Sequence, residues 1–585
     1  MQAYPSDRPS LSAGHALDSK VHAAIARLSA SISPTSIGLA WMDWATQLAA
    51  SPGKRLDLMV LALEQALRLS CYCQTVSLSP SSPQIRECIT PPSFDKRFKD
   101  EEWHRWPFNL IHQGFLLCDE WWHAATTNVR GVSRHHEHIV SFIARQWLDM
   151  LSPGNFPHTN PVVLRRTSET FGRNLIAGGI NLLEDIERIT TNRPPTHAHQ
   201  YRVGIDVART PGKVILRNRL IELIQYHPTT THVKREPVLI VPAWIMKYYI
   251  LDLSPHNSLI KHLIDQGYTV FCISWKNPGV KERDFELDDY LQLGFHTAID
   301  TIGRIVPDRK IHATGYCLGG TLLAIAAAAM AREKDERLQS ITLFTAQTDF
   351  RESGELALFI DENEVSLLEA QMEETGYLSA GQMAGAFQML RSNDLMWSRM
   401  IHEYLMGERA PVSDLMAWNA DTTRMPARMH GRYLRDLFLN NSLSEGRYRV
   451  KDEPITLFNI QAPIFCVATT ADHVAPWRSV YKLHYLTPAE ITFVLTTGGH
   501  NAGIVNSPER TDRTYRVLCR PAGGHYIPHQ RWLNEADGRQ GSWWPTWIEW
   551  LDARCSGQDR PPSIGPSESE IEHLTDAPGT YVYET

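Results

Sequence analysis

A thiol with the surroundings of a catalytic nucleophile lies in the middle of this sequence. Cys317 occupies the run Gly315–Gly320, which reads Gly-Tyr-Cys-Leu-Gly-Gly. Gly-x-Cys-x-Gly has the spacing of a nucleophile elbow, with cysteine where serine is usual. Glycines are needed there because Cβ atoms beside such a sharp, strained turn would collide with the backbone. The pattern predicts a thiol exposed at the start of a helix, whose dipole favours a thiolate, and therefore acyl transfer through a thioester.

A carboxylate and an imidazole that could complete the site follow further along the chain. Asp472 comes directly after the apolar run 465–471, and His500 comes directly after 493–499. An isolated Asp in such a place is commonly a helix cap, and an isolated His is commonly structural. Nucleophile, acid and histidine in this order, each at a predicted strand end, favour a catalytic triad. His473, next to Asp472, competes for a role, but the order favours His500 as the base, and we expect His473 to pack near the site.

Apolar strands alternate with helices around these residues. Helices are predicted over 258–265, over 287–305 and directly after Cys317. Such alternation predicts a mostly parallel sheet covered on both faces. Together with the elbow it predicts an α/β-hydrolase fold. The predicted strands are 237–242, 268–275, 310–314, 339–344, 462–468 and 491–495.

The composition along the chain divides it into three predicted parts. Residues 1–95 are punctuated by Ser and Pro and are predicted to be a variable, partly disordered extension with one helical patch. Residues 96–200 carry aromatic and aliphatic residues at helical spacing and are predicted to form a helical N-terminal domain. Residues 201–585 are predicted to be the catalytic domain. Within it, about 350–450 interrupts the alternation and is predicted to form a cap over the active site.

Bulk properties exclude several classes of protein. The 585 residues carry a net charge of −7, so nothing indicates nucleic-acid binding. The nine cysteines are irregularly spaced, which favours a reducing cytoplasm over a disulfide framework. We see no signal peptide, and the longest apolar stretch, about 322–330, is too short to span a bilayer. The run His135–His138 lacks the spacing of a zinc helix motif and is interpreted as a solvated face, so no metal or cofactor is expected.

Matches beyond the elbow lie in the segments 147–156, 240–253, 274–278, 390–395, 418–419, 471–477 and 499–503. From about Phe94 to its C-terminus, the chain resembles polyhydroxyalkanoate synthases, most closely the single-component, short-chain (class I) type. The departures are Ala243, Met246 and Asn501, where the family usually has proline, asparagine and an aliphatic residue, and they bear on monomer preference more than on reaction type.

The resemblance implies that (R)-3-hydroxyacyl-CoA is the substrate, with 3-hydroxybutyryl-CoA expected, and that polyester and free CoA are the products. His500 would deprotonate Cys317, and Asp472 would either orient His500 or help to activate the hydroxyl of the monomer. The backbone N–H groups of Leu318 and Ile245 are the expected oxyanion donors. The family also implies a homodimer in the cytoplasm, at the surface of polyester granules.

Three other functions remain open at this stage. A thioesterase or esterase of the same fold would pass the acyl group to water instead of a hydroxyl. A synthase specific for medium-chain monomers would differ in pocket volume, which the sequence does not reveal. A noncatalytic granule-binding protein would be expected to lack a member of the triad, and all three members are present here.

Overall fold

The computed structural model describes residues 13–29, 32–78, 87–91, 95–191, 200–383, 396–409, 411–565 and 575–585. The chain forms two compact units. The first contains residues 1–32, 196–384 and 412–585, and the second contains 33–195 and 385–411. Phe94 and the predicted segment 390–395 lie outside the described residues.

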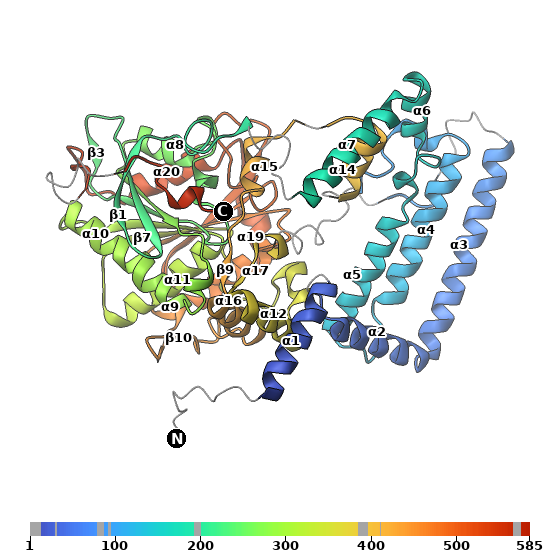
Figure 1. The fold of residues 1–585 in the computed structure, drawn as a ribbon, viewed down its shortest axis with the longest axis horizontal. Helices are drawn as coiled ribbons and strands as arrows, with labels where there is room; N and C mark the ends of the chain where they lie inside the picture. The colour runs from blue at the N-terminus through green and yellow to red at the C-terminus, as the bar shows by residue number, and fades with distance from the viewer. Residues whose placement is uncertain are drawn as a thin grey trace. The chain divides into compact units, whose positions relative to one another are not determined.

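The first unit is built on one large twisted sheet (Figure 1). Six neighbouring strands of the sheet, from β5 to β13, run parallel, and antiparallel strands flank them on both sides. This is the sheet of an α/β hydrolase, as the sequence predicts. In spatial order the strands are β1 (Gly212–Arg217), β2 (Ile221–Tyr226), β5 (Val270–Trp275), β4 (Val238–Val241), β6 (Ile311–Tyr316), β7 (Leu338–Phe344), β12 (Ile464–Thr469), β13 (Ile491–Thr496), β14 (Thr514–Arg520) and β15 (Asp537–Gln540).

The central strands are apolar because helices cover both of their faces. Every residue of β4, β5, β6, β12 and β13 is buried. Helices α8 (Leu259–Asp265) and α20 (Trp544–Asp552) cover one face, where the rings of His262 and Trp544 lie 5.4 Å apart. Helices α10 (Thr297–Ile305) and α11 (Leu318–Glu333) cover the other (Figure 1). Parallel pairing brings the carboxyl ends of these strands to one edge of the sheet, with Val241 beside Gly315 and Gly315 beside Leu343.

The helix predicted over 287–305 contains a π-helical turn. It consists of α9 (Leu287–Asp289), the π-helix η6 (Tyr290–His296) and α10. Gly294 lies against the Trp275 ring, and a Cβ at that position would come within 2.6 Å of it. The wider turn therefore coincides with a close contact between helix and sheet, which hydrophobic periodicity does not reveal.

The insertion after β7 is divided between the two units. Its helices α12 (Glu362–Thr375), α15 (Asp414–Asn419) and α16 (Ala427–Tyr433) belong to the first unit, as does the π-helix η10 (Leu434–Leu439). The N-terminal helix α1 (Ala13–Leu28) packs against α12, and Arg27 pairs with Glu374 at 2.5 Å. Residues 385–411 belong to the second unit, so the predicted cap of 350–450 is not one structural block.

The second unit is helical and includes residues that we placed in the variable extension. The predicted boundary at residue 95 differs from the structure, in which α2 and α3 pack with the later helices. Trp44 donates to the Ala125 carbonyl at 2.9 Å, and Trp121 donates to the Leu58 carbonyl at 3.1 Å. The main helices are α2 (Pro34–Ala49), α3 (Pro52–Leu78), α4 (Phe108–Thr126), α5 (Arg134–Met150), α6 (Pro161–Glu169) and α7 (Arg173–Thr190).

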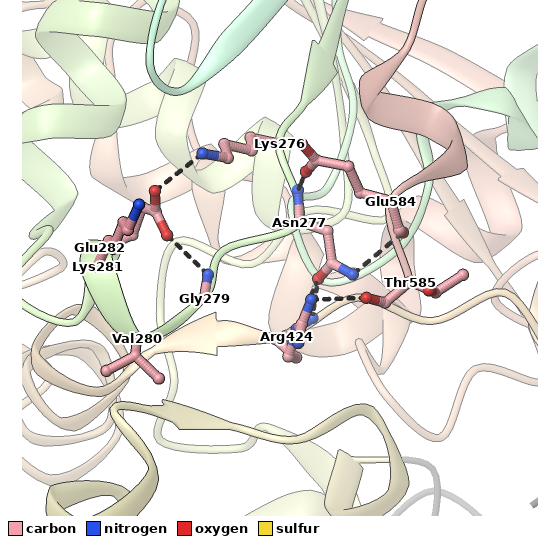
Figure 2. A pocket seen from close by; sticks show the side chains of 9 residues that line it. All are labelled: Lys276, Asn277, Gly279, Val280, Lys281, Glu282, Arg424, Glu584 and Thr585. Carbon is pink, nitrogen blue, oxygen red and sulfur yellow. Dashed lines mark hydrogen bonds and ion pairs between the residues drawn. The ribbon is translucent and has the colours of Figure 1, made fainter.

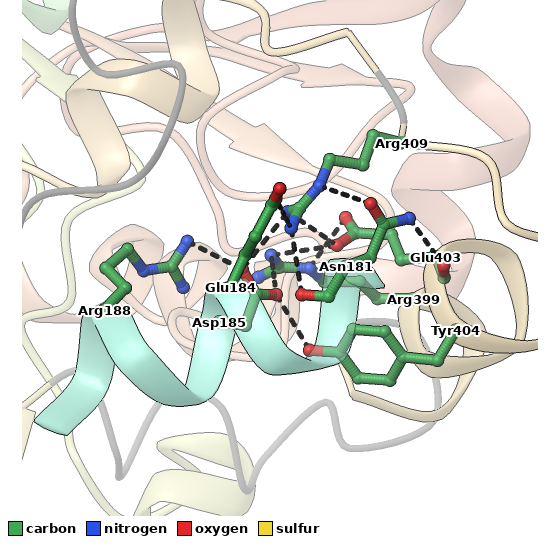
Figure 3. Close-up of polar contacts among 8 residues, drawn as sticks. All are labelled: Asn181, Glu184, Asp185, Arg188, Arg399, Glu403, Tyr404 and Arg409. Atoms are coloured by element: carbon green, nitrogen blue, oxygen red, sulfur yellow. Dashed lines mark hydrogen bonds and ion pairs between the residues drawn. The ribbon is translucent and has the colours of Figure 1, made fainter. Parts of the chain in front are cut away.

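A polar network holds the distant segment 398–409 against α7 (Figure 3). Asp185 of α7 is its centre, accepting hydrogen bonds from Tyr404 at 2.8 Å and from Arg409 at 3.2 Å. Burial alone would raise the pKa of Asp185. The hydrogen bonds and the nearby arginines outweigh burial, so the pKa of Asp185 lies below its ordinary value. At Gly178 a Cβ would lie 1.8 Å from the Tyr404 carbonyl oxygen, so the helix and the segment are in backbone contact.

Among the described helices, none is long and apolar enough to cross a membrane.

Candidate active site

Cys317 lies in a strained turn between β6 and α11. Its backbone φ is 51° and its ψ is −121°, a region that side-chain-bearing residues rarely occupy. The turn is held from the sheet side, because the Cys317 N–H donates to the Phe344 carbonyl of β7 at 2.8 Å. Leu318 and Gly319 begin α11, where backbone N–H groups have no acceptor within the helix. The thiol thus adjoins unpaired helix N–H groups at the carboxyl edge of the sheet.

The elbow glycines allow close backbone contacts. A Cβ on Gly315 would lie 2.4 Å from Gly320 Cα, and one on Gly319 would lie 2.1 Å from the Val241 carbonyl oxygen. The steric reason inferred from the sequence is therefore confirmed. The second contact also shows that the loop after β4 runs directly against the start of α11.

Asp472 and His500 lie at the same edge, in the loops after β12 and β13. The Nδ1 of His500 donates to Asp472 Oδ2 at 2.7 Å. Asp472 Oδ1 accepts the backbone N–H groups of Val474 at 2.9 Å and Ala475 at 2.8 Å. The Asp472 side chain is fully buried, and that of His500 is 14% exposed. With Nδ1 bonded to Asp472, Nε2 is the nitrogen left for proton transfer.

The electrostatics of His500 connect it to both partners. Burial alone would lower its pKa, but the charges of Asp472 and Cys317, and its hydrogen bonds to both, raise the pKa well above its ordinary value. An imidazole with a buried carboxylate on one side and a thiol on the other can hold the thiol proton. The structure thus brings together the three residues that the sequence singled out.

Two backbone N–H groups were predicted as oxyanion donors. Leu318 N–H is at the first position of α11, beside Cys317. Ile245 lies in the loop after β4, four residues beyond the Val241 carbonyl that approaches Gly319. Both residues are buried, with 9% and 7% of their surface exposed. Water is therefore largely excluded from the peptides that would face a developing oxyanion.

Comparison with known proteins places this geometry in a family. Residues 94–263 match the model "Poly-beta-hydroxybutyrate polymerase (PhaC) N-terminus", and residues 236–507 match the model "alpha/beta hydrolase fold". A poly(3-hydroxyalkanoate) polymerase of Methylorubrum extorquens is 41% identical over 84% of this chain and 81% of its own. The chain belongs to the poly(3-hydroxyalkanoate) polymerase family.

Further relatives of the same family support the assignment. A poly(3-hydroxyalkanoate) polymerase subunit of Cupriavidus necator is 34% identical over 84% of both chains. Residues 12–54 match the model "Poly-beta-hydroxybutyrate polymerase N terminal". Among solved structures, a monoacylglycerol lipase of Paleococcus ferrophilus is 17% identical over 57% of this chain and 99% of its own, with a TM-score of 0.34. The predicted family and the prediction of a polyhydroxyalkanoate synthase enzyme are confirmed by the relatives.

Two tyrosines lie near the thiol in this family member, and the sequence pattern indicates a role for neither. Tyr433 of α16 is buried, and burial together with the charge on Cys317 raises its pKa well above its ordinary value. Tyr316 precedes the nucleophile, donates to Asn501 Oδ1 and lies 5.8 Å from the His500 ring. Asn501, noted above as a departure from the family, thus has a specific partner. Tyr433 could not be foreseen, because only tertiary packing brings the insertion to the elbow.

The remaining candidates have other surroundings. His473 follows Asp472, and its side chain is exposed. His136, from the run 135–138, pairs with Asp43 at 2.7 Å. Donor atoms of Glu87, His104 and His112 lie within 4.8 Å of one another. However, His112 Nδ1 donates to the Phe108 carbonyl at 3.2 Å, and its Nε2 accepts from Gln113 at 2.9 Å, so a metal there would have to displace the Gln113 amide.

A pocket of about 500 Å³ opens beside the end of β5 (Figure 2). Lys276 pairs with Glu282 at 2.9 Å, and Arg424 donates to the Thr585 carbonyl at 2.8 Å. Because these two cations are engaged by protein groups, we assign the pocket no ligand. Two residues of the pocket are also joined to each other, because the backbone N–H of Arg424 donates to Asn277 Oδ1 at 2.9 Å.

Proposed function

We propose that this chain polymerises (R)-3-hydroxyacyl-CoA, and 3-hydroxybutyryl-CoA in particular, into polyhydroxyalkanoate with release of CoA. Membership of the polymerase family supports the reaction class. The observation that carries the chemistry is the hydrogen bond from His500 to buried Asp472, beside Cys317 in its strained turn. Exchange of one thioester for another is nearly balanced in free energy, so a cysteine nucleophile suits a CoA thioester.

The first step loads the enzyme. His500 Nε2 accepts the Cys317 thiol proton, and the thiolate attacks the carbonyl carbon of the substrate thioester. The N–H groups of Leu318 and Ile245 stabilise the oxyanion of the tetrahedral intermediate. The bond from the carbonyl carbon to the CoA sulfur then breaks, and the departing sulfur takes the proton held by His500. The products of this step are an acyl-Cys317 thioester and free CoA.

The second step forms the ester bond of the polymer. The hydroxyl of a monomer attacks an acyl thioester and transfers its proton to His500. Collapse of the tetrahedral intermediate joins the hydroxyl oxygen to the acyl carbon and releases a thiolate. Every proton in the cycle passes through one imidazole, so no metal ion or prosthetic group is required by this scheme.

Asp472 is proposed to orient His500 rather than to activate the hydroxyl directly. Its side chain is fully buried, and hydrogen-bond donors already occupy both carboxylate oxygens. A carboxylate held in this way fixes the imidazole tautomer and stabilises the imidazolium. If Asp472 instead served the hydroxyl, Asp472→Asn would slow elongation and spare acylation. Equal loss of both steps is the result expected for orientation.

The location, assembly and monomer preference of the protein are also proposals. By analogy with the family, the chain acts as a homodimer in the cytoplasm at the surface of polyester granules. The preference for monomer chain length is measured by comparing activity on a panel of short- to medium-chain CoA thioesters. Each methylene is expected to change the specificity by roughly 1–3 kcal/mol.

The test of the proposal is CoA release from (R)-3-hydroxybutyryl-CoA by wild-type protein and by Cys317→Ala. Loss of turnover with Cys317→Ala is expected. Cys519→Ala, which replaces an exposed cysteine on β14, is the matched control and should retain activity. Turnover that survives in Cys317→Ala would exclude the acyl-Cys317 route. Soluble hydroxy acid in place of insoluble polyester would show a thioesterase instead.

A further inference from the structure

A segment of the insertion is bound along the loop that follows β4. This segment, Trp418–Arg424, is called the strap here. Trp418 Nε1 donates to the Lys247 carbonyl at 2.8 Å, and Thr422 forms a β-bridge with Met246. The strap ends at Arg424, whose backbone N–H donates to Asn277 Oδ1 at 2.9 Å (Figure 2). Its two ends are therefore fixed to loops at the carboxyl edge of the sheet.

Within the strap, Thr423 contacts the part of the loop that carries Ile245, the residue predicted to donate to the oxyanion. Its hydroxyl donates to the Trp244 carbonyl at 2.7 Å, and its backbone N–H donates to the Ile245 carbonyl at 3.2 Å. The residue is 2% exposed, so water does not compete for these bonds. Thr423 thus binds the carbonyls of two successive peptide groups.

The first of those carbonyls belongs to the peptide unit that contains the Ile245 N–H. A peptide group is planar and trans, so its C=O and N–H point in opposite directions. A donor that fixes the carbonyl on one side therefore fixes the direction of the N–H on the other. A hydrogen bond to the carbonyl also polarises the peptide, which makes the N–H a stronger donor. Both effects act on the atom that would bind the oxyanion.

We propose that Thr423 is a positioning residue, whose hydroxyl orients and polarises the Trp244–Ile245 peptide so that the Ile245 N–H stabilises the transition state of acylation. The inference rests on the proposed function, because it takes Ile245 as an oxyanion donor. It gives the insertion a part in catalysis. A donor that must be held before the reaction begins contributes to the rate and not to substrate binding.

The test compares Thr423→Val, which removes the hydroxyl at constant shape, with Thr423→Ser, which keeps it. Thr423→Val should lower kcat for CoA release from (R)-3-hydroxybutyryl-CoA by about 5- to 30-fold and leave KM within about twofold. That loss is smaller than the roughly 10²–10³-fold caused by removal of an oxyanion donor itself. Thr423→Ser should recover most of the rate.

Trp418→Phe is the matched control, because it removes a hydrogen bond between the strap and the Lys247 carbonyl, which lies outside the Trp244–Ile245 peptide. It should keep kcat within about threefold, even where its melting temperature falls as far as that of Thr423→Val. A wild-type kcat in Thr423→Val would overturn the positioning role. So would equal losses of kcat in Thr423→Val and Trp418→Phe when their melting temperatures fall equally. Failure of serine to restore the rate would overturn it as well.

A parallel measurement separates this inference from the proposed polymerisation. Acylation by a p-nitrophenyl ester reports on the oxyanion hole whatever the final acyl acceptor. A wild-type protein that makes no polymer while its ester acylation falls in Thr423→Val would refute polymerisation and retain the role of Thr423. Polymer formation together with equal ester acylation by both proteins would refute the role of Thr423 alone.

Discussion

Two cysteine–histidine pairs lie at opposite ends of the same strand, and only one has the environment of a catalytic pair. At the carboxyl end of β6, Cys317 adjoins His500. Near the amino end, His312 Nε2 lies 3.7 Å from Cys555 Sγ, and its Nδ1 lies 2.6 Å from Ser340 Oγ. Burial lowers the pKa of His312 to about 4 and raises the pKa of Cys555 to about 11. The second pair is therefore a neutral thiol beside a neutral imidazole.

The contrast teaches that proximity does not activate a thiol. Both imidazoles are buried, and burial alone lowers the pKa of each. The Nδ1 of His500 is hydrogen-bonded to the carboxylate of Asp472, which stabilises an imidazolium. The Nδ1 of His312 is hydrogen-bonded to the hydroxyl of Ser340. The charges of Glu236 and Asp552 also act on His312 and raise its pKa, but they do not outweigh its burial. The two pairs thus differ in whether a carboxylate is hydrogen-bonded to the imidazole.

The largest expected effect comes from removing the charge of that carboxylate. Asp472→Asn should lower the rate of CoA release by about 10³–10⁴-fold, because the amide neither fixes the His500 tautomer nor stabilises its charge. Ser340→Ala removes the uncharged hydroxyl that is hydrogen-bonded to the histidine of the second pair. It should leave CoA release within about twofold and lower the free energy of unfolding by about 1–2 kcal/mol. Comparable rate losses in the two variants would contradict the comparison.

The sequence predicts the parallel strands and the triad because these features are local. Central strands such as β12 are short apolar runs. Cys317 directly follows β6, and Asp472 and His500 come within four residues of the ends of β12 and β13. The flanking strands escaped prediction because they mix charged and polar residues with apolar ones, even in β2, where every residue is buried. In β1, for example, Lys213 and Arg217 interrupt the apolar pattern.

The surroundings of the triad could not be predicted in the same way. Thr423 binds the loop after β4, and Tyr433 lies near enough to Cys317 for the charge of Cys317 to raise its pKa, only because an insertion returns to this part of the fold. The close approach of His312 to Cys555 joins residues 243 apart in the chain. Such contacts depend on tertiary packing, for which a single sequence carries no periodic signal.

Thiol alkylation should separate the two cysteines next most strongly. Iodoacetamide at pH 7 should modify Cys317 at least about 10³-fold faster than Cys555, because a pKa of about 11 leaves Cys555 almost no thiolate. Peptide mapping by mass spectrometry measures both rates in one sample. Preincubation with substrate should protect Cys317 and leave the rate at Cys555 unchanged. Similar rates at the two positions would mean that the pairs do not differ as described.

The second pair should contribute to the pH dependence of stability. Because the folded pKa of His312 lies below its ordinary value of 6.5, folding favours its neutral form. The resulting stabilisation is present above pH 6.5 and is lost as the pH falls towards 4, by about 2–3 kcal/mol in total. His312→Gln cannot take up the proton, so its unfolding midpoint should depend less on pH over this range. Parallel pH profiles for the two proteins would exclude this contribution.

The smallest effect concerns the bond between Tyr316 and Asn501. Tyr316→Phe should reduce kcat by about 3- to 10-fold, because it frees the loop that carries His500 from one of its attachments. Asn501→Leu should have a similar effect. The double variant should be little worse than either single variant, since both changes remove the same bond. Additive losses would show that the two residues act separately.

The most direct test of the central claim is to identify the acylated residue. Wild-type protein is mixed with labelled (R)-3-hydroxybutyryl-CoA, quenched in acid and mapped by peptide mass spectrometry. The account predicts that the hydroxyacyl group is attached to Cys317 and that Cys555 is unmodified. A protein that makes polymer while Cys317 carries no acyl group at any time during turnover would contradict it.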